Sequence, residues 1–407
     1  MLKLIQNYPL FTKLISLNLM SKLGNKLLYT VLLTLASQLK QGNQAIMMVN
    51  LFETLPLLFS FFLGTHANHI TTKLKISSYN SLSQFIFYLL IGYLLSLSLT
   101  FNRLAFIVFL KSAASLLMIF TSSLTTPFTK LLVLKKDLQR TQGIISLFTQ
   151  LVNTIGNTLG AFLFGFLLLS TIAYLNAGLF LIVWIGYSLV SPKLRGVEKT
   201  LPLLKKRHSI FKESLTIFDT LTKQKKLTSE LGQLAIINGF FGGIMPLFVM
   251  YLTANDYHTH HSLPLILALF STLTTFGLII GAAFSIQLTR HISLSTYNIF
   301  STSFMILTVL GFYLNSLPLI FITIFTLSIL TGSLSPHFSS QLIWTYPAET
   351  LGGIVTTVNS LLALISPIAG LTFPFIALLN LNYAYYALFI YSGGTFILIR
   401  LSRLKIT

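Results

Sequence analysis

Stretches of about 20 mostly apolar residues recur along almost the whole sequence, separated by short polar or Gly- and Pro-containing connectors. A helix of that length matches the hydrocarbon core of a bilayer, where the backbone must satisfy its own hydrogen bonds. Only 9% of the residues are charged, against about 25% in an ordinary soluble domain. A single soluble core cannot bury this much apolar surface. The sequence therefore predicts an all-α, multi-pass membrane protein.

The apolar stretches predict about twelve transmembrane helices. The first six are expected near 11–38, 44–65, 77–99, 103–126, 141–168 and 170–190. After a polar stretch, six more are expected near 229–253, 263–286, 293–313, 318–340, 351–377 and 382–400. With an even number of spans, both termini lie on the same side of the membrane.

Lysine and arginine are distributed unequally between the two predicted sides. Most lie on the side that holds both termini, whereas the opposite side has only Lys40 and Arg103. The basic side of a multi-pass protein is normally the cytoplasmic one, so we expect both termini in the cytoplasm. This placement explains the net charge of +19 by topology and by attraction to anionic membrane lipids. A nucleic-acid partner is therefore not expected.

A basic stretch divides the chain into two sets of six spans. We expect an N-terminal six-helix bundle at 1–191, a cytoplasmic linker at 192–228 and a C-terminal six-helix bundle at 229–407. Apolar residues of the linker recur at roughly helical spacing: Ile210, Phe211, Leu215, Ile217, Phe218 and Leu221. Two interpretations remain open, an amphipathic helix along the inner membrane surface and a solvated basic linker.

The two sets of spans also contain matching motifs. Gly64 precedes Lys73 by nine residues, and Gly281 precedes Arg290 by the same separation. A second pair of motifs opens the fifth and the eleventh span: Gly143-Ile144-Ile145-Ser146 and Gly353-Ile354-Val355-Thr356. Such echoes indicate parallel repeats of six helices.

Several motifs together give the chain a resemblance to a known family. They are Ser21-Lys22-Leu23-Gly24-Asn25-Lys26, Glu53-Thr54-Leu55-Pro56, the connector from Thr126-Pro127 to Asp137-Leu138, and Pro347-Ala348-Glu349-Thr350-Leu351-Gly352-Gly353 followed by Ser366-Pro367. The chain resembles the major facilitator superfamily, and within it the bacterial drug-efflux branch that includes macrolide exporters. The resemblance implies the major facilitator fold, a bacterial cytoplasmic membrane and secondary active transport of a small-molecule substrate.

The loop after the second span departs from the family pattern, Gly-x-x-x-Asp-Arg-x-Gly-Arg-Arg/Lys. Gly64 and Lys73 remain, but Asn68 replaces the acid, and the central Arg and Gly are lost. In the family this loop latches the two halves and gates their movement. The resemblance therefore implies gating roles for Gly64, Asn68 and Lys73, and for Gly281 and Arg290 in the second repeat, without the usual charge latch.

Charged residues lie inside predicted spans, where each costs about 2.5–3.5 kcal/mol on insertion scales. Lys22 and Lys26 are four residues apart and share one helix face. Glu53 lies at a matching depth in the antiparallel second span, so it can meet either lysine. We expect Glu53 to exchange a proton while one lysine holds or releases it. The alternative is a static ion pair that orients the first two helices.

Lys111 is the fourth candidate for proton coupling. It lies eight residues into the fourth predicted span, where the wider superfamily often has a basic residue linked to proton movement. The alternative is a lysine whose ammonium group reaches the outer membrane surface along its own stem. Both interpretations stay open.

The fifth span carries a polar stripe. Ser146, Gln150, Asn153 and Asn157 are spaced four, three and four residues apart, on one narrow helix face. Amides facing lipid would lack hydrogen-bond partners, so this face is expected to line the substrate cavity, or to bond to neighbouring helices. Asn157 also lies in the family's antiporter motif, Gly-Pro-x-x-Gly-Gly, here Gly156-Asn157-Thr158-Leu159-Gly160-Ala161 without its proline.

Other polar residues deep in spans are further cavity candidates: Asn18, Asn25, Asn238 and Asn359. Asn25 stands where many relatives have an aspartate. Asn238 is followed by Gly239, Gly242, Gly243 and Pro246, where we expect a bend at which the seventh helix gates.

Enzyme and cofactor chemistry find little support in the sequence. There is no cysteine, no Gly-Lys-Ser/Thr phosphate loop and no catalytic constellation, so neither an ATP motor nor a cofactor is expected. His258, His260 and His261 beside Asp256 fit no familiar metal-site spacing, and we interpret them as a solvated loop.

We expect a monomeric transporter that exports amphipathic drugs or antibiotics by alternating access, driven by proton antiport, with Na⁺ as the alternative coupling ion. Two alternatives remain. One is an uptake transporter for a small solute. The other is a non-transporting immunity or sensor membrane protein derived from a transporter, because a fold does not fix a function.

Overall fold

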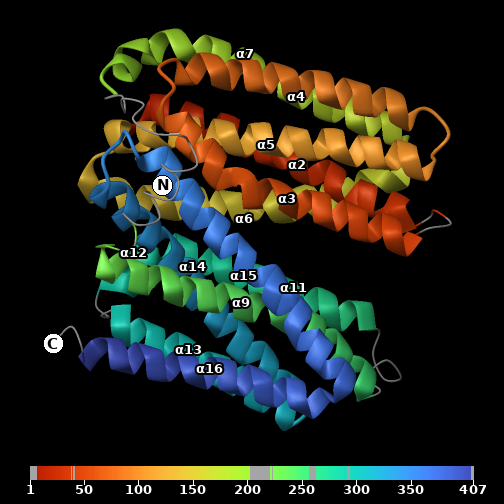
Figure 1. Ribbon diagram of the computed structural model, residues 1–407, viewed down its shortest axis with the longest axis vertical. Coiled ribbons are helices and arrows are strands. Elements are labelled where there is room, and N and C mark those ends of the chain that lie inside the picture. The colour runs from red at the N-terminus through yellow and green to blue at the C-terminus, as the bar shows by residue number, and fades with distance from the viewer. Residues whose placement is uncertain are drawn as a thin grey trace. The chain divides into compact units, whose positions relative to one another are not determined.

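The computed structural model describes residues 7–37, 39, 42–201, 221, 223–255, 263–290 and 294–404, and its regular secondary structure there is helical (Figure 1). The first six long helices are α2 (Pro9–Ser37), α3 (Gly42–Asn68), α4 (Lys73–Leu95), α5 (Phe101–Leu132), α6 (Lys135–Phe166) and α7 (Leu169–Lys199). They are followed by α9 (Lys225–Ala254), α11 (Leu263–Ala283), the short α12 (Ser285–Arg290), α13 (Leu294–Tyr313), α14 (Leu317–Thr345), α15 (Leu351–Leu379) and α16 (Leu381–Leu404). Each predicted span coincides with one long helix, which confirms the all-α fold.

Within the described part of the chain, six of these helices are long and apolar enough to cross a membrane by length and composition. They lie in α5, α7, α9, α11, α14 and α15. In α13 the apolar part, Ile299–Tyr313, is shorter than a full span. Charged residues interrupt two of the other helices. Three lysines fall within α2, and α6 begins with the charged run Lys135, Lys136 and Asp137.

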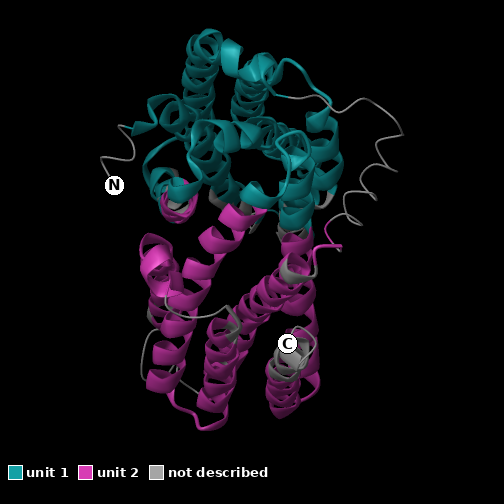
Figure 2. Cartoon of the chain, turned by 90° about the vertical axis from the view of Figure 1, so that its left-hand side faces the viewer, with its two compact units in different colours: residues 1–137, 151–220, 343–360 teal, residues 138–150, 221–342, 361–407 magenta. Residues whose placement is uncertain are grey.

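The chain forms two compact units, and each contains a segment from the opposite half of the sequence (Figure 2). Unit 1 comprises residues 1–137, 151–220 and 343–360, and unit 2 comprises residues 138–150, 221–342 and 361–407. The division passes through α6 and α15.

The helices also extend into the expected linker, because α7 ends at Lys199 and α9 begins at Lys225. Residues 210–218 of the expected amphipathic segment, and the histidines at 258–261, lie outside the described residues.

Unit 1 is built around α2, which contacts α3, α5 and α7, while α4 packs along α7 and α3 along α5. Its apolar core includes the fully buried Leu28, Ile107 and Phe180. The ring of Phe180 stacks on that of Tyr88 with 4.9 Å between the ring centroids. Burial of large side chains of this kind gives the helices a fixed mutual arrangement.

In unit 2, α13 packs along α16, and both contact α9. The glycines of α9 allow close packing: a Cβ atom at Gly242 would lie 2.2 Å from the carbonyl oxygen of Ser366 on α15. At Gly243 it would lie 2.3 Å from the Phe373 ring. The helix continues through Pro246 to Ala254, so these glycines serve helix contact, and gating at this point stays a prediction.

Candidate functional site

Three charged side chains from α2, α3 and α5 meet inside unit 1. Lys26 Nζ lies 2.9 Å from Glu53 Oε1, and Lys111 Nζ forms a second ion pair with Glu53 Oε2. Tyr29, nearly one turn after Lys26, places its ring centroid 5.5 Å from Lys26 Nζ and 5.2 Å from Lys111 Nζ. An aromatic face at this distance attracts a cation. We call Lys26, Glu53 and Lys111 the charge cluster.

The charge cluster is buried unevenly. The side chain of Lys111 is 4% exposed, that of Glu53 is 20% exposed and that of Lys26 is 33% exposed. Lys26 is thus the most exposed member of the cluster. Removing the carboxylate would leave Lys111 buried beside a like charge, which is energetically costly. With all three groups ionised, the two lysines and the glutamate carry a net charge of +1.

The sequence predicted part of this arrangement. It offered Lys22 and Lys26 as alternative partners of Glu53, and the structure places Lys26 in the ion pair. It treated Lys111 separately, whereas the structure brings Lys111 to the same carboxylate. The ion pair of Lys111 with Glu53 favours a role inside the span over an ammonium group that reaches the membrane surface. A role of the cluster in proton coupling stays a prediction.

Asn25 is the centre of a hydrogen-bond network beside the charge cluster. Its Oδ1 accepts hydrogen bonds from Tyr88 Oη at 3.0 Å and from Ser115 Oγ at 3.4 Å. Its Nδ2 donates to the Ser21 carbonyl oxygen at 3.2 Å and contacts Met118 Sδ at 3.0 Å. The side chain is buried. Asn25 therefore joins α2 to α4 and α5, and these contacts favour a helix-positioning role over cavity lining.

Asn18 has a similar position two turns earlier on α2. Its Nδ2 donates to Thr125 Oγ1 at 3.0 Å, and its Oδ1 accepts from Tyr187 Oη at 2.9 Å. Its two bonds connect α2 with α5 and α7. Both groups of the amide are thus engaged within the unit, as buried polar groups normally are.

The sequence interpretation missed several buried polar residues of unit 1. Asn80 donates to Thr121 Oγ1 at 3.0 Å, and Gln84 donates to the Ala114 carbonyl oxygen at 2.8 Å. Together with Tyr88 they are spaced four and four residues apart on one face of α4, a pattern visible in the sequence. Asn176 on α7 also donates to a backbone carbonyl, that of Gly24, at 2.8 Å.

The remaining cavity candidates are more open. Ser146 and Gln150 are half-buried in unit 2, and Asn153 is half-buried in unit 1. Asn238 is half-buried on α9, whereas Asn359 is exposed on α15. The side chain of Asn157 is not among those that the structure describes. An exposed amide within a long apolar helix is consistent with a watery path, and cavity lining by these residues stays a prediction.

Close packing ties the end of α3 to the start of α15 inside unit 1. A Cβ atom at Gly64 would lie 1.6 Å from Thr356 Oγ1 and 2.7 Å from the carbonyl oxygen of Gly352, so only glycine fits. One turn earlier, Ser60 forms a hydrogen bond to Ser360. The hydroxyl of Ser360 also donates to the Leu57 carbonyl oxygen at 2.9 Å.

Asn68 completes this contact. Its Oδ1 accepts a hydrogen bond from the backbone N–H of Gly353 at 3.1 Å. The first N–H groups of a helix have no partner within the helix, and Asn68 satisfies one of them in α15. Lys73 is buried and donates to the Ala67 carbonyl oxygen. We call Gly64, Asn68, Gly352, Gly353 and Thr356 the α3–α15 latch.

Unit 2 contains a counterpart at the start of α6. A Cβ atom at Gly143 would lie 2.7 Å from the carbonyl oxygen of Ala282 at the end of α11. Gln139 Nε2 donates to Thr289 Oγ1 at 2.7 Å. Gly281 approaches α14, where its Cβ atom would lie 2.0 Å from the Ile329 carbonyl oxygen, and Arg290 is exposed. The motifs repeated in the sequence thus meet crosswise, α3 with α15 and α11 with α6.

Residues 14–370 match the family model of the Major Facilitator Superfamily. The chain belongs to this superfamily. Solved structures agree with the assignment at the level of fold. One is a bacterial homologue of the iron transporter ferroportin in an outward-facing state, with a TM-score of 0.69, 14% identity and coverage of 97% of this chain and 98% of that one.

Two other solved structures are similar over the same length. The proton:xylose symporter XylE has a TM-score of 0.64 and 11% identity, covering 97% of this chain and 96% of its own. The human organic anion transporter MFSD10 has a TM-score of 0.63 and 18% identity, covering 97% and 98%. No curated protein matches the chain significantly. The family identifies a multi-pass membrane transporter rather than an enzyme.

Proposed function

We propose that this major facilitator is a proton-coupled secondary transporter in which Glu53 carries the exchanged proton. The observation that carries the proposal is the bridge from Glu53 to both Lys26 and Lys111. Ionisable groups within a membrane span are costly and mark ion pathways. Glu53 is the acidic member of the cluster, and its partial exposure allows a proton to reach it.

Protonation of Glu53 changes the contacts of three helices at once. It abolishes both ion pairs and raises the net charge of the cluster from +1 to +2, so that Lys26 and Lys111 repel each other. The position of α3 between α2 and α5 then becomes less favourable. Gly64 lies eleven residues further along α3, about 16 Å at 1.5 Å per residue. The proton at Glu53 is thereby coupled, through α3, to the α3–α15 latch.

For substrate and direction, we propose export of amphipathic drugs or antibiotics by alternating access. This part rests on the resemblance to the drug-efflux branch. The positive charge of the cluster favours a second candidate, uptake of an acidic solute together with a proton. Lys26 is one-third exposed, and an anionic group would find complementary charge there.

Transport by cells and by reconstituted vesicles tests the proposal. Cells that express the chain should accumulate less of an amphipathic toxic compound, and an uncoupler should abolish the difference. Greater accumulation of an acidic solute would instead support uptake. Unchanged accumulation across a broad panel would contradict transport.

The coupling role of Glu53 requires a separate measurement. In vesicles, Glu53→Gln should abolish accumulation driven by a pH gradient but retain substrate exchange without a gradient. Retained exchange also shows that the variant is folded. Glu349→Gln removes a carboxylate in the connector between α14 and α15 and should keep both activities. Gradient-driven transport that survives Glu53→Gln would overturn the proton role.

A further inference from the structure

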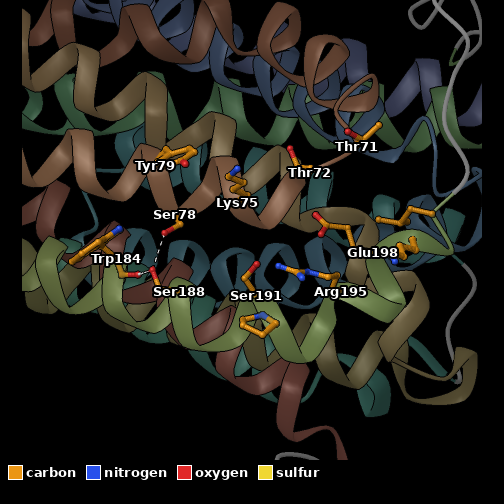
Figure 3. A pocket seen from close by; sticks show the side chains of 13 residues that line it. Thr71, Thr72, Lys75, Ser78, Tyr79, Trp184, Ser188, Ser191, Arg195 and Glu198 are labelled. Atoms are coloured by element: carbon orange, nitrogen blue, oxygen red, sulfur yellow. Dashed lines mark hydrogen bonds between the residues drawn. The ribbon is translucent and has the colours of Figure 1, made fainter.

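A cavity of about 930 Å³ lies between the start of α4 and the end of α7 in unit 1 (Figure 3). Neither the charge cluster nor the α3–α15 latch contributes to its lining. Lys75, Arg195 and Lys199 bring three cationic groups to it. Hydroxyl groups of both helices face the same space, and Ser78 and Ser188 are hydrogen-bonded at 3.0 Å. We call this the α4–α7 pocket.

The pocket carries an excess of positive charge. Among the described residues that line it, Glu198 is the one carboxylate. It accepts a hydrogen bond from the backbone N–H of Leu74 at 2.9 Å, at the start of α4. Lys75, Arg195 and Lys199 are exposed, and none of them forms an ion pair with another described residue. Cationic and hydroxyl groups around one cavity are suited to a phosphate group.

An apolar face continues from the pocket along α4. Tyr79 lines the pocket, and Ile86, Leu90 and Tyr93 follow it at spacings of seven, four and three, on the same face of the helix. All four side chains are about half exposed. From Tyr79 to Tyr93 the face extends about 21 Å at 1.5 Å per residue, more than the roughly 15 Å depth of one leaflet of a bilayer's hydrocarbon core.

We propose that the α4–α7 pocket binds the headgroup phosphate of an anionic phospholipid. The acyl chains then lie along the exposed face of α4, and the hydroxyl groups hydrogen-bond to the phosphate ester. The basic character of the pocket places it on the side of the membrane where lysine and arginine collect. Anionic lipid is attracted to clustered basic residues at that surface. The proposal is independent of the transported substrate.

The two tryptophans of the chain make the pocket accessible to measurement. Trp184 lines the pocket, and Trp344 lies elsewhere, on α14. The full-length Trp344→Phe variant therefore reports on the pocket alone. It is reconstituted into phosphatidylcholine vesicles that contain either phosphatidylglycerol or phosphatidylcholine with brominated acyl chains. At equal mole fraction, brominated phosphatidylglycerol should quench Trp184 fluorescence more strongly.

Charge variants in the same background identify the contacts. Lys75→Gln, Arg195→Gln and Lys199→Gln should each weaken the apparent affinity for phosphatidylglycerol by about fivefold. Lys193→Gln removes an exposed charge from α7 that does not line the pocket, and it should leave the preference unchanged. Equal quenching by both lipids in folded Trp344→Phe protein would overturn the proposal. A preference that survives removal of all three charges would do so as well.

A soluble phosphate ester could use the same groups. Inorganic phosphate and glycerol phosphate are therefore titrated against the protein in vesicles of unbrominated phosphatidylcholine. We expect no change in Trp184 fluorescence at millimolar concentration. A saturable change that depends on Lys75, Arg195 and Lys199, without a preference between the two brominated lipids, would assign the pocket to a soluble phosphate and contradict the lipid proposal.

Discussion

Asn68 Oδ1 accepts a hydrogen bond from the backbone nitrogen of Gly353, 3.1 Å away. Gly353 is the third residue of α15, so this bond satisfies an N–H group that the helix itself leaves unpaired. The family pattern has an acid followed by an arginine at this point, whereas the chain has Asn68 followed by His69. A neutral amide makes the bond without burying a carboxylate that lacks its arginine.

Replacing Asn68 by alanine should weaken the α3–α15 latch. Loss of a side-chain acceptor at a helix N-terminus costs about 0.5–2 kcal/mol. We expect a lower thermal unfolding temperature in detergent and faster proteolysis near the start of α15. Gln44→Ala, at the exposed opposite end of α3, is the matched control and should show neither effect. An unfolding temperature equal to that of the wild type would contradict the importance of this bond.

Gly64→Ala should be strongly destabilising, because its new methyl group would meet Thr356 Oγ1 at 1.6 Å and the Gly352 backbone at 2.7 Å. Gly178→Ala is the control, since no atom lies within 4 Å of a Cβ atom there. Alanine is favoured over glycine in a helix by about 1 kcal/mol, so Gly178→Ala should be neutral or stabilising. Thermal unfolding of both variants, and of Gly64→Ala with Thr356→Ala, measures the difference. Full rescue by the second substitution would show that the Gly352 backbone is not the obstacle.

Glu53→Gln should destabilise the protein by about 3–5 kcal/mol, the range found when one partner of a buried ion pair is removed. The Lys111 side chain, which is only 4% exposed, would then lie beside Lys26 without a carboxylate to balance its charge. Adding Lys111→Met removes the uncompensated charge, so the double variant should recover much of the stability. Thermal unfolding of the two single variants and the double variant gives the coupling between Glu53 and Lys111. Additive effects would argue against the ion pair.

Asn25→Ala should cost more than Tyr88→Phe. The alanine leaves Tyr88 Oη without its acceptor in a buried site, at about 1–3 kcal/mol for an unsatisfied group, and it also removes the bond from Asn25 Nδ2 to the Ser21 carbonyl oxygen. Ser115 Oγ keeps the Lys111 carbonyl oxygen as an acceptor at 3.1 Å. Tyr88→Phe removes one donor and leaves Asn25 with Ser115. The comparison uses unfolding temperatures of both variants. A loss for Tyr88→Phe as large as that for Asn25→Ala would contradict the central role of Asn25, because the phenylalanine keeps the ring stacked on Phe180 and removes only the hydroxyl group.

The helices were predictable from the sequence because each one corresponds to a continuous apolar stretch that is bounded by polar or Gly- and Pro-containing connectors. Their ends were less predictable. The helix α7 continues to Lys199 through the basic residues of the expected linker, since a charged helix end can extend into water. Hydropathy identifies the apolar part of a helix, but it does not identify the polar residues by which the same helix extends beyond the membrane.

The charge cluster was only half predictable. Lys26 and Glu53 lie on consecutive helices joined by a short connector, so their depths could be compared directly. The meeting of Lys111 with Glu53 depends on the packing of α3 against α5, with α4 between them in the sequence. No local pattern encodes that neighbourhood. The repeated motifs could be found in the sequence. Their pairing, α3 with α15 and α11 with α6, could not be predicted from it.

The exchange of residues 138–150 and 343–360 between the units has a consequence for how this polypeptide matures. As synthesis proceeds from the N-terminus, unit 1 lacks residues 343–360 until most of the chain has been made. Unit 1 therefore cannot include all of its residues until residues 343–360 have been made. Residues 138–150 likewise precede the rest of unit 2 in synthesis. Each half of the sequence supplies one segment of the other unit, so we expect unit 1 to reach its final packing only after residues 343–360 have been made.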